Sequence, residues 1–539
     1  MRYFLTLSLV LFCFGTKPGY AKHLVFLVSD THAAYENYEA FGAQISKKVT
    51  SFRKDNPTGQ VLFVFNGDIG GISTSGELDY GYLDFELITA LSKSFDVVTS
   101  LGNHEGFDFN DIHPPQEIFL EQANKFTKIT GRKILSANLA PVAEAKHLFD
   151  PYQDHQWGKT KLRIVGISLK TFFYESNYQF NSAFRVFENI DPPEYLDTLK
   201  TQIQMAANDG IDTVLFFIHD GGKRLESVWR EFVDWKNSDP VLSKIYTPLL
   251  GAGHLHQKVN LDVQKTKIVE AGYEFDFAAI TLDDDLKEVI EVEQFSPKNF
   301  SVSPKDSVIA ELADVVASAG KILSQGDAEN AIEIAPPLIE ILYHPSQKAD
   351  FRKQKVGHIL ATAIQEYAQR ELEKDSGKFG SQTVVATLGF YNLLSYGWGA
   401  KIDRLFEERI TMGAVKSMLH FKSRIGMKVL KGSDVLATIA ALRKYSLSSA
   451  RPFLTPLFSY NFIERDNEYW VVGANKQLTR VEPEHLYLVA MDHYTYNNGY
   501  KIDELDEVYK RAIWTGVGPV NRNIIIPFIQ NCRSHLIKP

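Results

Sequence analysis

Two histidines one residue apart mark the stretch of the chain with the strongest chemical signal. His254 and His256 follow an apolar run, and Gly253 directly precedes the pair. Residues i and i+2 of an extended segment point to the same face, so the two imidazole rings are expected to face one centre. Imidazole nitrogen is a common metal ligand, and a metal site here needs further ligands from other parts of the chain.

Four polar segments upstream can supply these ligands. Each follows a short apolar run of the kind that forms a strand buried on both faces. The segments are Asp30-Thr31-His32, Asn66-Gly67-Asp68, Gly102-Asn103-His104-Glu105 and His219-Asp220-Gly221-Gly222. In α/β proteins the ligand site lies beyond the carboxyl ends of the strands. All five segments are therefore expected to converge on one centre.

This set of side chains suits a pair of metal ions. Two divalent ions about 3.5–4 Å apart need a bridging carboxylate, and they clamp the attacking and leaving oxygens of an in-line displacement. Asp68, which follows a strand and a glycine, suits the bridge. The other expected ligands are Asp30, His32 and His256 for one ion, and Asn103, His219 and His254 for the other. Such ions lower the pKa of a bound water toward about 7 and so supply hydroxide near neutral pH.

His104 is expected to act beside the metals. It directly follows Asn103, so on an extended segment its ring points away from the side chain of its neighbour. A histidine near the metals but not bound to them suits contact with a phosphoryl oxygen or with the leaving group. Taken singly, each motif has a structural alternative, because Gly-Asp is common in turns. The occurrence of all five in order, each at a strand end, favours a catalytic site.

The order of predicted elements indicates two domains. Strands and helices alternate from residue 23 to about residue 285, which predicts an α/β domain with helices at 38–52, 83–91, 118–129 and 193–207. Residues 294–305 have linker composition, and residues 307–323 are amphipathic. From about residue 330 helices precede short strands, which predicts a separate α+β domain. The expected boundaries are 22–290 for the first domain, 291–330 for a linker with a bridging helix, and 331–539 for the second domain.

The first 21 residues have the pattern of an export signal. Arg2 gives a positive start, residues 4–14 are apolar, and residues 19–21 form a small-x-small cleavage site. The apolar run is shorter than the roughly 18 residues that a spanning helix needs, so no stable membrane anchor is expected. A mature chain beginning at Lys22 keeps one cysteine, Cys532, and therefore no internal disulfide. These features predict a periplasmic or secreted bacterial protein.

Composition narrows the classes of partner. The 539 residues carry a formal net charge of −8 and no long basic run, so nucleic acid is not an expected partner. With so few cysteines, any metal is expected to be held by nitrogen and oxygen ligands.

Together the five segments resemble the signature of the calcineurin-like metallophosphoesterases. Within that superfamily the chain resembles the bacterial 5′-nucleotidase family, which includes nucleotidase/UDP-sugar hydrolases and 2′,3′-cyclic nucleotide phosphodiesterases. The export signal, the segment Leu135-Ser136-Ala137-Asn138 and the two-domain length add to the resemblance.

The resemblance implies a fold, a cofactor and a reaction. The fold is a four-layer αββα metallophosphoesterase domain followed by an α+β 5′-nucleotidase-type domain that binds the substrate. The cofactor is a pair of divalent ions such as Zn, Mn or Fe, and the reaction is hydrolysis of a small phosphate ester, expected to be a nucleotide, by metal-activated water. The resemblance assigns one ion to Asp30, His32, Asp68 and His256, and the other to Asp68, Asn103, His219 and His254. It also places Asn103 and His104 in contact with the substrate.

The chain departs from the family pattern in two places. The family has Asn-His-Glu-Phe-Asp, in which the Asp orients the catalytic His. Here Gly106 is inserted, so Asp108 either orients His104 or is only a loop residue. In the second domain, residues 392–397 replace the family's Asn-x-Gly-Gly-x-Arg loop, and the arginine is absent. Three aromatic residues are candidates for stacking on a base, namely Phe421, Tyr496 and Tyr500. The alternative is that they pack in the core of the domain.

Three functions fit this sequence. The first is an exported dinuclear phosphohydrolase of the 5′-nucleotidase type. The second keeps the hydrolytic centre but acts on a non-nucleotide phosphomonoester or phosphodiester, because the specificity loops of the second domain diverge. The third is a non-enzymatic binding protein on the same scaffold, against which the complete set of metal ligands argues.

Overall fold

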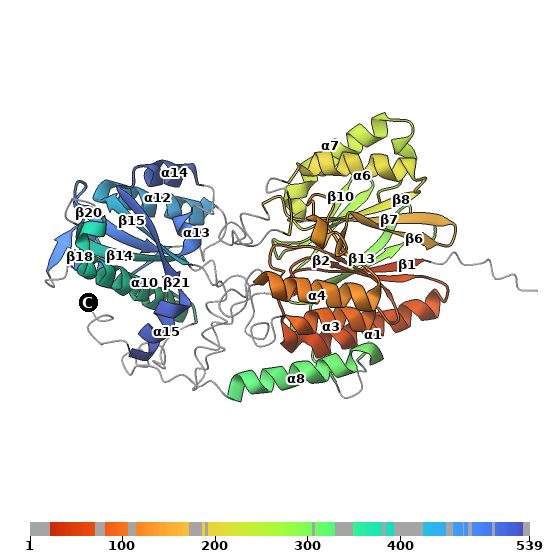
Figure 1. Cartoon of the computed structure of the whole chain (residues 1–539), viewed down its shortest axis with the longest axis horizontal. Coiled ribbons are helices and arrows are strands. Elements are labelled where there is room, and N and C mark those ends of the chain that lie inside the picture. Colours follow the sequence, from red (N-terminus) through yellow and green to blue (C-terminus); the bar gives the residue numbers. More distant parts are fainter. Residues whose placement is uncertain are drawn as a thin grey trace, which may run out of the picture.

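The computed structural model describes most of the chain in two domains (Figure 1). The described residues are 22–69, 81–105, 115–171, 186–188, 192–303, 308–328, 349–379, 384–392, 424–448, 456–466, 468–472, 477–497 and 502–531. The predicted export signal and the predicted site residues Asp108, Phe421 and Tyr500 lie outside them. No helix in the described ranges is both long and apolar enough to cross a membrane.

The N-terminal domain is built on two sheets. The 7-stranded sheet has the order β13-β12-β1-β2-β3-β4-β5, and the strands from β1 to β5 run parallel. Its strands are β1 (His23–Val28), β2 (Val61–Asn66), β3 (Asp96–Ser100), β4 (Ile134–Leu135), β5 (Phe149–Asp150), β12 (Phe277–Leu282) and β13 (Val289–Phe295). The 6-stranded sheet has the order β10-β11-β9-β8-β7-β6. Its strands are β6 (Tyr152–Trp157), β7 (Thr160–Ile167), β8 (Thr213–Ile218), β9 (Leu249–Ala252), β10 (Lys258–Val263) and β11 (Thr266–Ala271).

Helices cover the outer face of each sheet, which gives four layers (Figure 1). The first sheet packs against α1 (Tyr38–Asp55), α3 (Tyr82–Leu91) and α4 (Pro115–Thr130), and the second against α6 (Tyr195–Asn208) and α7 (Gly222–Ser238). Between the sheets lies a core of aliphatic and aromatic side chains, including Leu27, Val64 and Phe217. Strands such as β1 and β2 are buried along their whole length, because each faces a helix layer on one side and the other sheet on the other.

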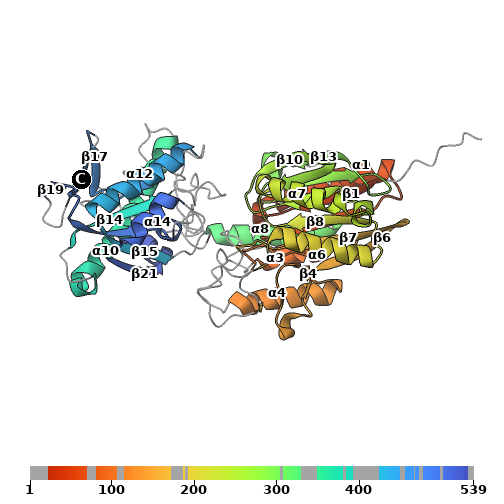
Figure 2. The same ribbon diagram turned by 90° about the horizontal axis from the view of Figure 1, so that it is seen from above.

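The C-terminal domain has a sheet of its own, and it forms a separate lobe in Figure 2. The 5-stranded sheet has the order β16-β14-β20-β15-β21, with strands β14 (Val384–Asn392), β15 (Arg424–Lys431), β16 (Pro456–Phe458), β20 (Leu486–Met491) and β21 (Trp514–Val520). One face packs on α10 (Ala349–Lys374) and α15 (Arg522–Asn531), and the other on α12 (Gly432–Ser448) and α14 (Asp503–Lys510). A 3-stranded sheet adds β17 (Phe462–Arg465), β18 (Glu468–Val472) and β19 (Leu478–Arg480).

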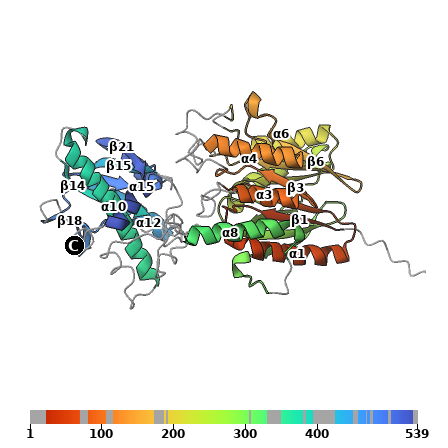
Figure 3. The same cartoon turned by 60° about the horizontal axis from the view of Figure 1, so that its bottom comes forward.

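The structure confirms the predicted α/β domain followed by an α+β domain. The four helices predicted in the first half are α1, α3, α4 and α6. The amphipathic stretch after residue 307 contains α8 (Ala313–Ala328), which lies across α1 and α3 of the N-terminal domain (Figure 3). Two elements differ from the sequence prediction. Helix α7 was not predicted, and β13 pairs with β12 as far as Phe295, inside the stretch expected to be a linker.

Candidate metal centre

The five predicted segments lie at the carboxyl ends of five strands, as expected. They follow β1, β2 and β3 of the first sheet and β8 and β9 of the second, so the site spans the ends of both sheets. The backbone there is not extended as the sequence argument assumed. A left-handed backbone, rare for residues with a side chain, occurs at Asp30 (φ 53°), His32 (φ 48°), Asp68 (φ 53°), His254 (φ 71°) and His256 (φ 58°). Such conformations persist where the surrounding structure fixes them, and they are frequent at functional sites.

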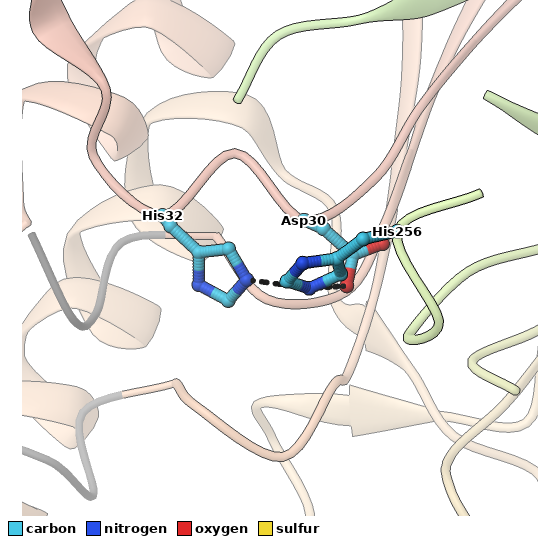
Figure 4. Close-up of side chains that lie close together, drawn as sticks. All are labelled: Asp30, His32 and His256. Carbon is cyan, nitrogen blue, oxygen red and sulfur yellow. Dashed lines mark hydrogen bonds and ion pairs between the residues drawn. The ribbon is translucent and has the colours of Figure 1, made fainter. Parts of the chain in front are cut away.

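The turns place His254 and His256 in two different clusters, and the shared face of an extended strand expected for the pair does not form. The sequence prediction assigned the two histidines to different ions. The first cluster contains Asp30, His32 and His256. His256 Nε2 lies 3.1 Å from His32 Nε2 and 3.2 Å from Asp30 Oδ1. Figure 4 shows the three side chains converging, with His256 between the other two.

The second cluster contains Asp68, His219 and His254. Asp68 Oδ2 lies 3.1 Å from His219 Nε2. His254 Nδ1 lies 3.1 Å from Asn103 Oδ1, so Asn103 stands beside this cluster as predicted. The rings of His219 and His254 meet edge to face, with their centroids 5.5 Å apart. All seven predicted ligands are therefore gathered in two adjacent groups.

These spacings fit metal ligands. Two atoms bound to one ion at about 2.1 Å lie roughly 3.0–3.4 Å apart when the angle between the bonds is that of octahedral or tetrahedral geometry. The separations of 3.1 and 3.2 Å within the first cluster fall in this range, as do those of 3.1 Å in the second. The donor atoms are imidazole nitrogens and carboxylate or amide oxygens, which suit divalent transition ions.

Burial and charge act against each other on these groups. Burial raises the pKa of the Asp30 carboxyl, but the adjacent His256 outweighs it and holds this pKa at about 2. Burial also opposes ionisation of Asp68, and His219 holds its pKa well below the usual range. Desolvation lowers the pKa of His32 well below its ordinary value and lowers that of His256. The first cluster thus offers an ionised carboxylate and neutral imidazoles, the protonation states in which these groups bind metal.

Comparison with known proteins agrees with this geometry. Residues 23–152, which supply three of the five loops, match the calcineurin-like phosphoesterase family. The chain carries a calcineurin-like metallophosphoesterase domain. No curated protein matches the sequence of the chain.

Solved structures share the two-domain fold of this chain. A 5′-nucleotidase precursor from Thermus thermophilus has a TM-score of 0.60 at 14% identity, covering 94% of this chain and 96% of its own. A putative 5′-nucleotidase from Staphylococcus aureus has a TM-score of 0.58 at 12% identity, covering 96% and 98%. The sulfate thiohydrolase SoxB from Thermus thermophilus has a TM-score of 0.54 at 13% identity, covering 95% and 94%. At such identities the likeness is one of fold.

His104 lies at the first cluster of the metallophosphoesterase domain. Its ring meets that of His32 edge to face, with centroids 5.4 Å apart, and its side chain is only partly buried. Its backbone N–H donates to Asp68 Oδ1 at 2.9 Å. Among the described residues, neither of the two clusters that could hold a metal ion includes His104. This is the position predicted for a histidine that acts beside the metals.

Backbone and side-chain bonds beneath the site hold the ligands in place. His219 Nδ1–H donates to the carbonyl of Asn66 at 2.7 Å, which orients the ring with Nε2 facing the cluster. The Asn66 side chain donates to the Ile218 carbonyl at 3.2 Å and so ties β2 to β8. Asn138, in the segment noted in the sequence, links the two sheets a second time. Its side-chain nitrogen donates to the Ser168 carbonyl, and its side-chain oxygen accepts the Ser168 N–H.

Sequence reasoning missed Asp84, a fully buried acid of α3. Its carboxylate accepts from the Thr31 hydroxyl at 2.8 Å, from the Ala33 N–H at 3.1 Å and from the Tyr38 hydroxyl. It therefore anchors the left-handed turn that carries Asp30 and His32. No motif indicated this residue, because an acid inside a helix is ordinarily solvated.

Glycines leave room for the ligands, and Gly102 is the tightest case. A Cβ atom on Gly102 would lie 2.2 Å from both the backbone N and Oδ1 of Asp68. Gly102→Ala is therefore expected to displace Asp68 and to lower metal affinity about 10–100-fold, the usual effect of disturbing the groups around a metal ligand. Metal content after dialysis and kcat/KM measure the effect.

Gly320→Ala is the matched control for Gly102→Ala. Gly320 is an exposed residue of α8, and a Cβ there meets nothing within 4 Å. This substitution should leave metal content unchanged and stabilise the helix by about 0.5–1 kcal/mol. A Gly102→Ala protein with wild-type metal content would contradict the assigned geometry.

Tyr496 is the one predicted base-stacking residue that the structure describes. It ends the short helix α13 (His493–Tyr496), and its ring lies over the ammonium of Lys428, with 4.0 Å from Nζ to the ring centroid. The same ring packs against Gly426, where a Cβ would meet it at 2.0 Å. The structure thus places Tyr496 against β15, and its role toward a base stays a prediction.

Proposed function

We propose that this metallophosphoesterase uses two divalent ions to hydrolyse a phosphate ester. The observation that carries the proposal is the place of one atom, Asp68 Oδ2. It lies 3.1 Å from His219 Nε2 in the second cluster and 4.0 Å from His32 Nε2 in the first. A carboxylate oxygen between two ligand sets is what a bridged pair of ions needs.

The proposed ligand sets follow the two clusters. One ion would be held by Asp30, His32, Asp68 and His256, and the other by Asp68, Asn103, His219 and His254. The nitrogen and oxygen donors fit Zn, Mn or Fe. When bound, such ions lower the pKa of a water molecule toward about 7 and polarise a phosphoryl oxygen.

The roles of the residues around the ligands are also part of the proposal. His104 is assigned contact with a phosphoryl oxygen or with the leaving group, because its ring stands beside the first cluster. Asn103 adds a substrate contact from the second cluster. The assignment of Asp108 as the residue that orients His104 rests on the sequence pattern alone.

A nucleotide is the proposed substrate. The 5′-nucleotidase precursor from Thermus thermophilus and the putative 5′-nucleotidase from Staphylococcus aureus share the fold over nearly the whole chain, which supports this class. The second candidate is a non-nucleotide phosphomonoester or phosphodiester. It is favoured by the divergent residues 392–397, and the sulfate thiohydrolase SoxB has a similar two-domain fold. The fold therefore admits more than one substrate class.

A substrate panel decides between these candidates. The purified chain is loaded with Mn²⁺ or Zn²⁺ and assayed with nucleoside 5′-monophosphates, cyclic nucleotides, a UDP-sugar, a sugar phosphate and a bis-aryl phosphate. We expect the highest kcat/KM for a nucleotide, and its loss on adding a chelator. Turnover of non-nucleotide esters alone would move the assignment to the second candidate. A metal-loaded chain that hydrolyses none of them would support the binding-protein alternative.

We further propose that the protein is exported, on the pattern of residues 1–21. Expression of the full chain in a Gram-negative host should give a periplasmic product whose N-terminal sequence begins at Lys22. A product that keeps residues 1–21 and stays in the cytoplasm would exclude export.

A further inference from the structure

A buried carboxylate behind the site joins the two loops that carry three of the histidine ligands. Glu270 lies on β11 beside Ala252 of β9 and is fully buried. Its Oε2 accepts the backbone N–H of Gly222 at 3.0 Å, and its Oε1 accepts that of Gln257 at 3.2 Å. Gly222 follows His219 by three residues, and Gln257 directly follows His256.

Glu270 is the acceptor for both of these N–H groups. Gly222 is the first residue of α7, and no side chain caps that end of the helix from the preceding residue. The first N–H groups of a helix have no acceptor inside the helix, and a negative charge there is favourable. Gln257 lies in the turn between β9 and β10. One acid thus satisfies one donor in each loop.

The two loops also touch each other. A Cβ on Gly221 would lie 2.2 Å from Leu255 Cδ1, so the chain after His219 packs directly on the chain between His254 and His256. A shift of either loop therefore moves the other. The Gln294 side chain of β13 also donates to the backbone carbonyl of Glu270 at 2.8 Å. This bond ties β11 to the first sheet.

We propose that Glu270 is a positioning residue for the metal centre, which sets His219, His254 and His256 at ligand spacing. This inference rests on the proposed metal-dependent function. The two converging N–H donors each bond a different oxygen of the Glu270 carboxylate. A carboxamide has one acceptor and an NH₂ donor, so Gln in place of Glu270 sets a donor against a backbone N–H. The loop facing that donor must move, and its histidine moves with it.

The test compares metal affinity with fold stability in the full chain. Co²⁺ titration followed by visible absorption gives affinity and coordination geometry, and melting with a chelator gives the stability of the metal-free fold. For Glu270→Gln we expect affinity to fall about 10–100-fold with an altered absorption spectrum, as is typical for residues that orient metal ligands. Excess Co²⁺ should restore the spectrum in part. Glu270→Asp, which keeps both oxygens on a shorter side chain, should lose less.

Glu293→Gln is the matched control for Glu270→Gln. Glu293 is a partly exposed acid of β13 that pairs with Lys48, away from the ligand loops. This variant should bind Co²⁺ like the wild type. If Glu270→Gln binds Co²⁺ with wild-type affinity and spectrum but melts lower in chelator, Glu270 only stabilises the fold and the inference is wrong. If the wild type binds Co²⁺ tightly but hydrolyses no ester, the proposed function fails while the affinity comparison still decides the role of Glu270.

Discussion

Asp68→Asn is expected to remove bound metal and hydrolytic activity together. Asp68 Oδ2 faces both clusters, so the amide that replaces it deprives both proposed ions of their shared anionic ligand. Two divalent ions supply several kcal/mol of charge stabilisation in the transition state. Their loss corresponds to a decrease in kcat/KM of about a thousandfold or more, since each 1.4 kcal/mol is about a factor of ten.

Asp96→Asn is the matched control for this substitution. Asp96 begins β3 in the same sheet, at the end away from the site, and pairs with Arg132 at 2.6 Å. Its bond with His155 and that with Arg132 hold its pKa at about 2, so it is also an ionised acid. Elemental analysis and kcat/KM should be unchanged in Asp96→Asn. A metal-loaded, active Asp68→Asn protein would end the assignment of Asp68 as the bridge.

The strands that carry the site were predictable because burial determines their sequences. β1, β2 and β8 lie between a helix layer and the other sheet. Each is buried along its whole length, and five of its six residues are apolar. Their ends could be located because a polar segment begins where the apolar run of each strand stops. The gathering of the ligands at these ends followed from the general rule for parallel strands.

The backbone at the site was not predictable from the same rule. His254 and His256 were expected to share one strand face, yet β9 ends at Ala252 and both residues are left-handed. The assignment of the two histidines to different ions did not include the left-handed turn that separates their rings, and strand periodicity cannot give such a turn. The turn depends on contacts distant in sequence, such as the two bonds from the His254 N–H to the Asp30 carboxylate.

The two acids that hold the ligand loops could not be predicted from the sequence, for a related reason. Asp84 and Glu270 have no motif, and a lone acid in a helix or strand is usually a solvated residue. Only the tertiary structure shows that both are fully buried and accept bonds from the loops of the ligands. Helix α7 is a different case, because its buried residues Leu225, Trp229 and Phe232 have helical spacing that the sequence displays.

His104→Ala is expected to lower kcat about 10²–10⁴-fold, the usual contribution of a positioned acid or base, while metal content stays at the wild-type level. The side chain contacts the His32 ring, but the bond from residue 104 to Asp68 is made by the backbone N–H, which alanine keeps. Removing the imidazole should therefore spare the proposed metal ligands and remove only the group proposed to contact the substrate. This outcome separates a residue that acts on the ester from one that holds metal, a distinction that Asp68→Asn cannot make.

The control for His104→Ala is His147→Ala. His147 forms a solvent-exposed hydrogen bond with Asn124. It should leave both kcat and metal content unchanged. The pattern of kinetic constants then identifies the role of His104. A fall in kcat with little change in KM means that the imidazole acts in the transition state, whereas a rise in KM alone means that it binds substrate and transition state equally. If His104→Ala instead loses metal in proportion to activity, His104 belongs to the metal centre, and the division of the site into two ligand sets and one adjacent histidine is wrong.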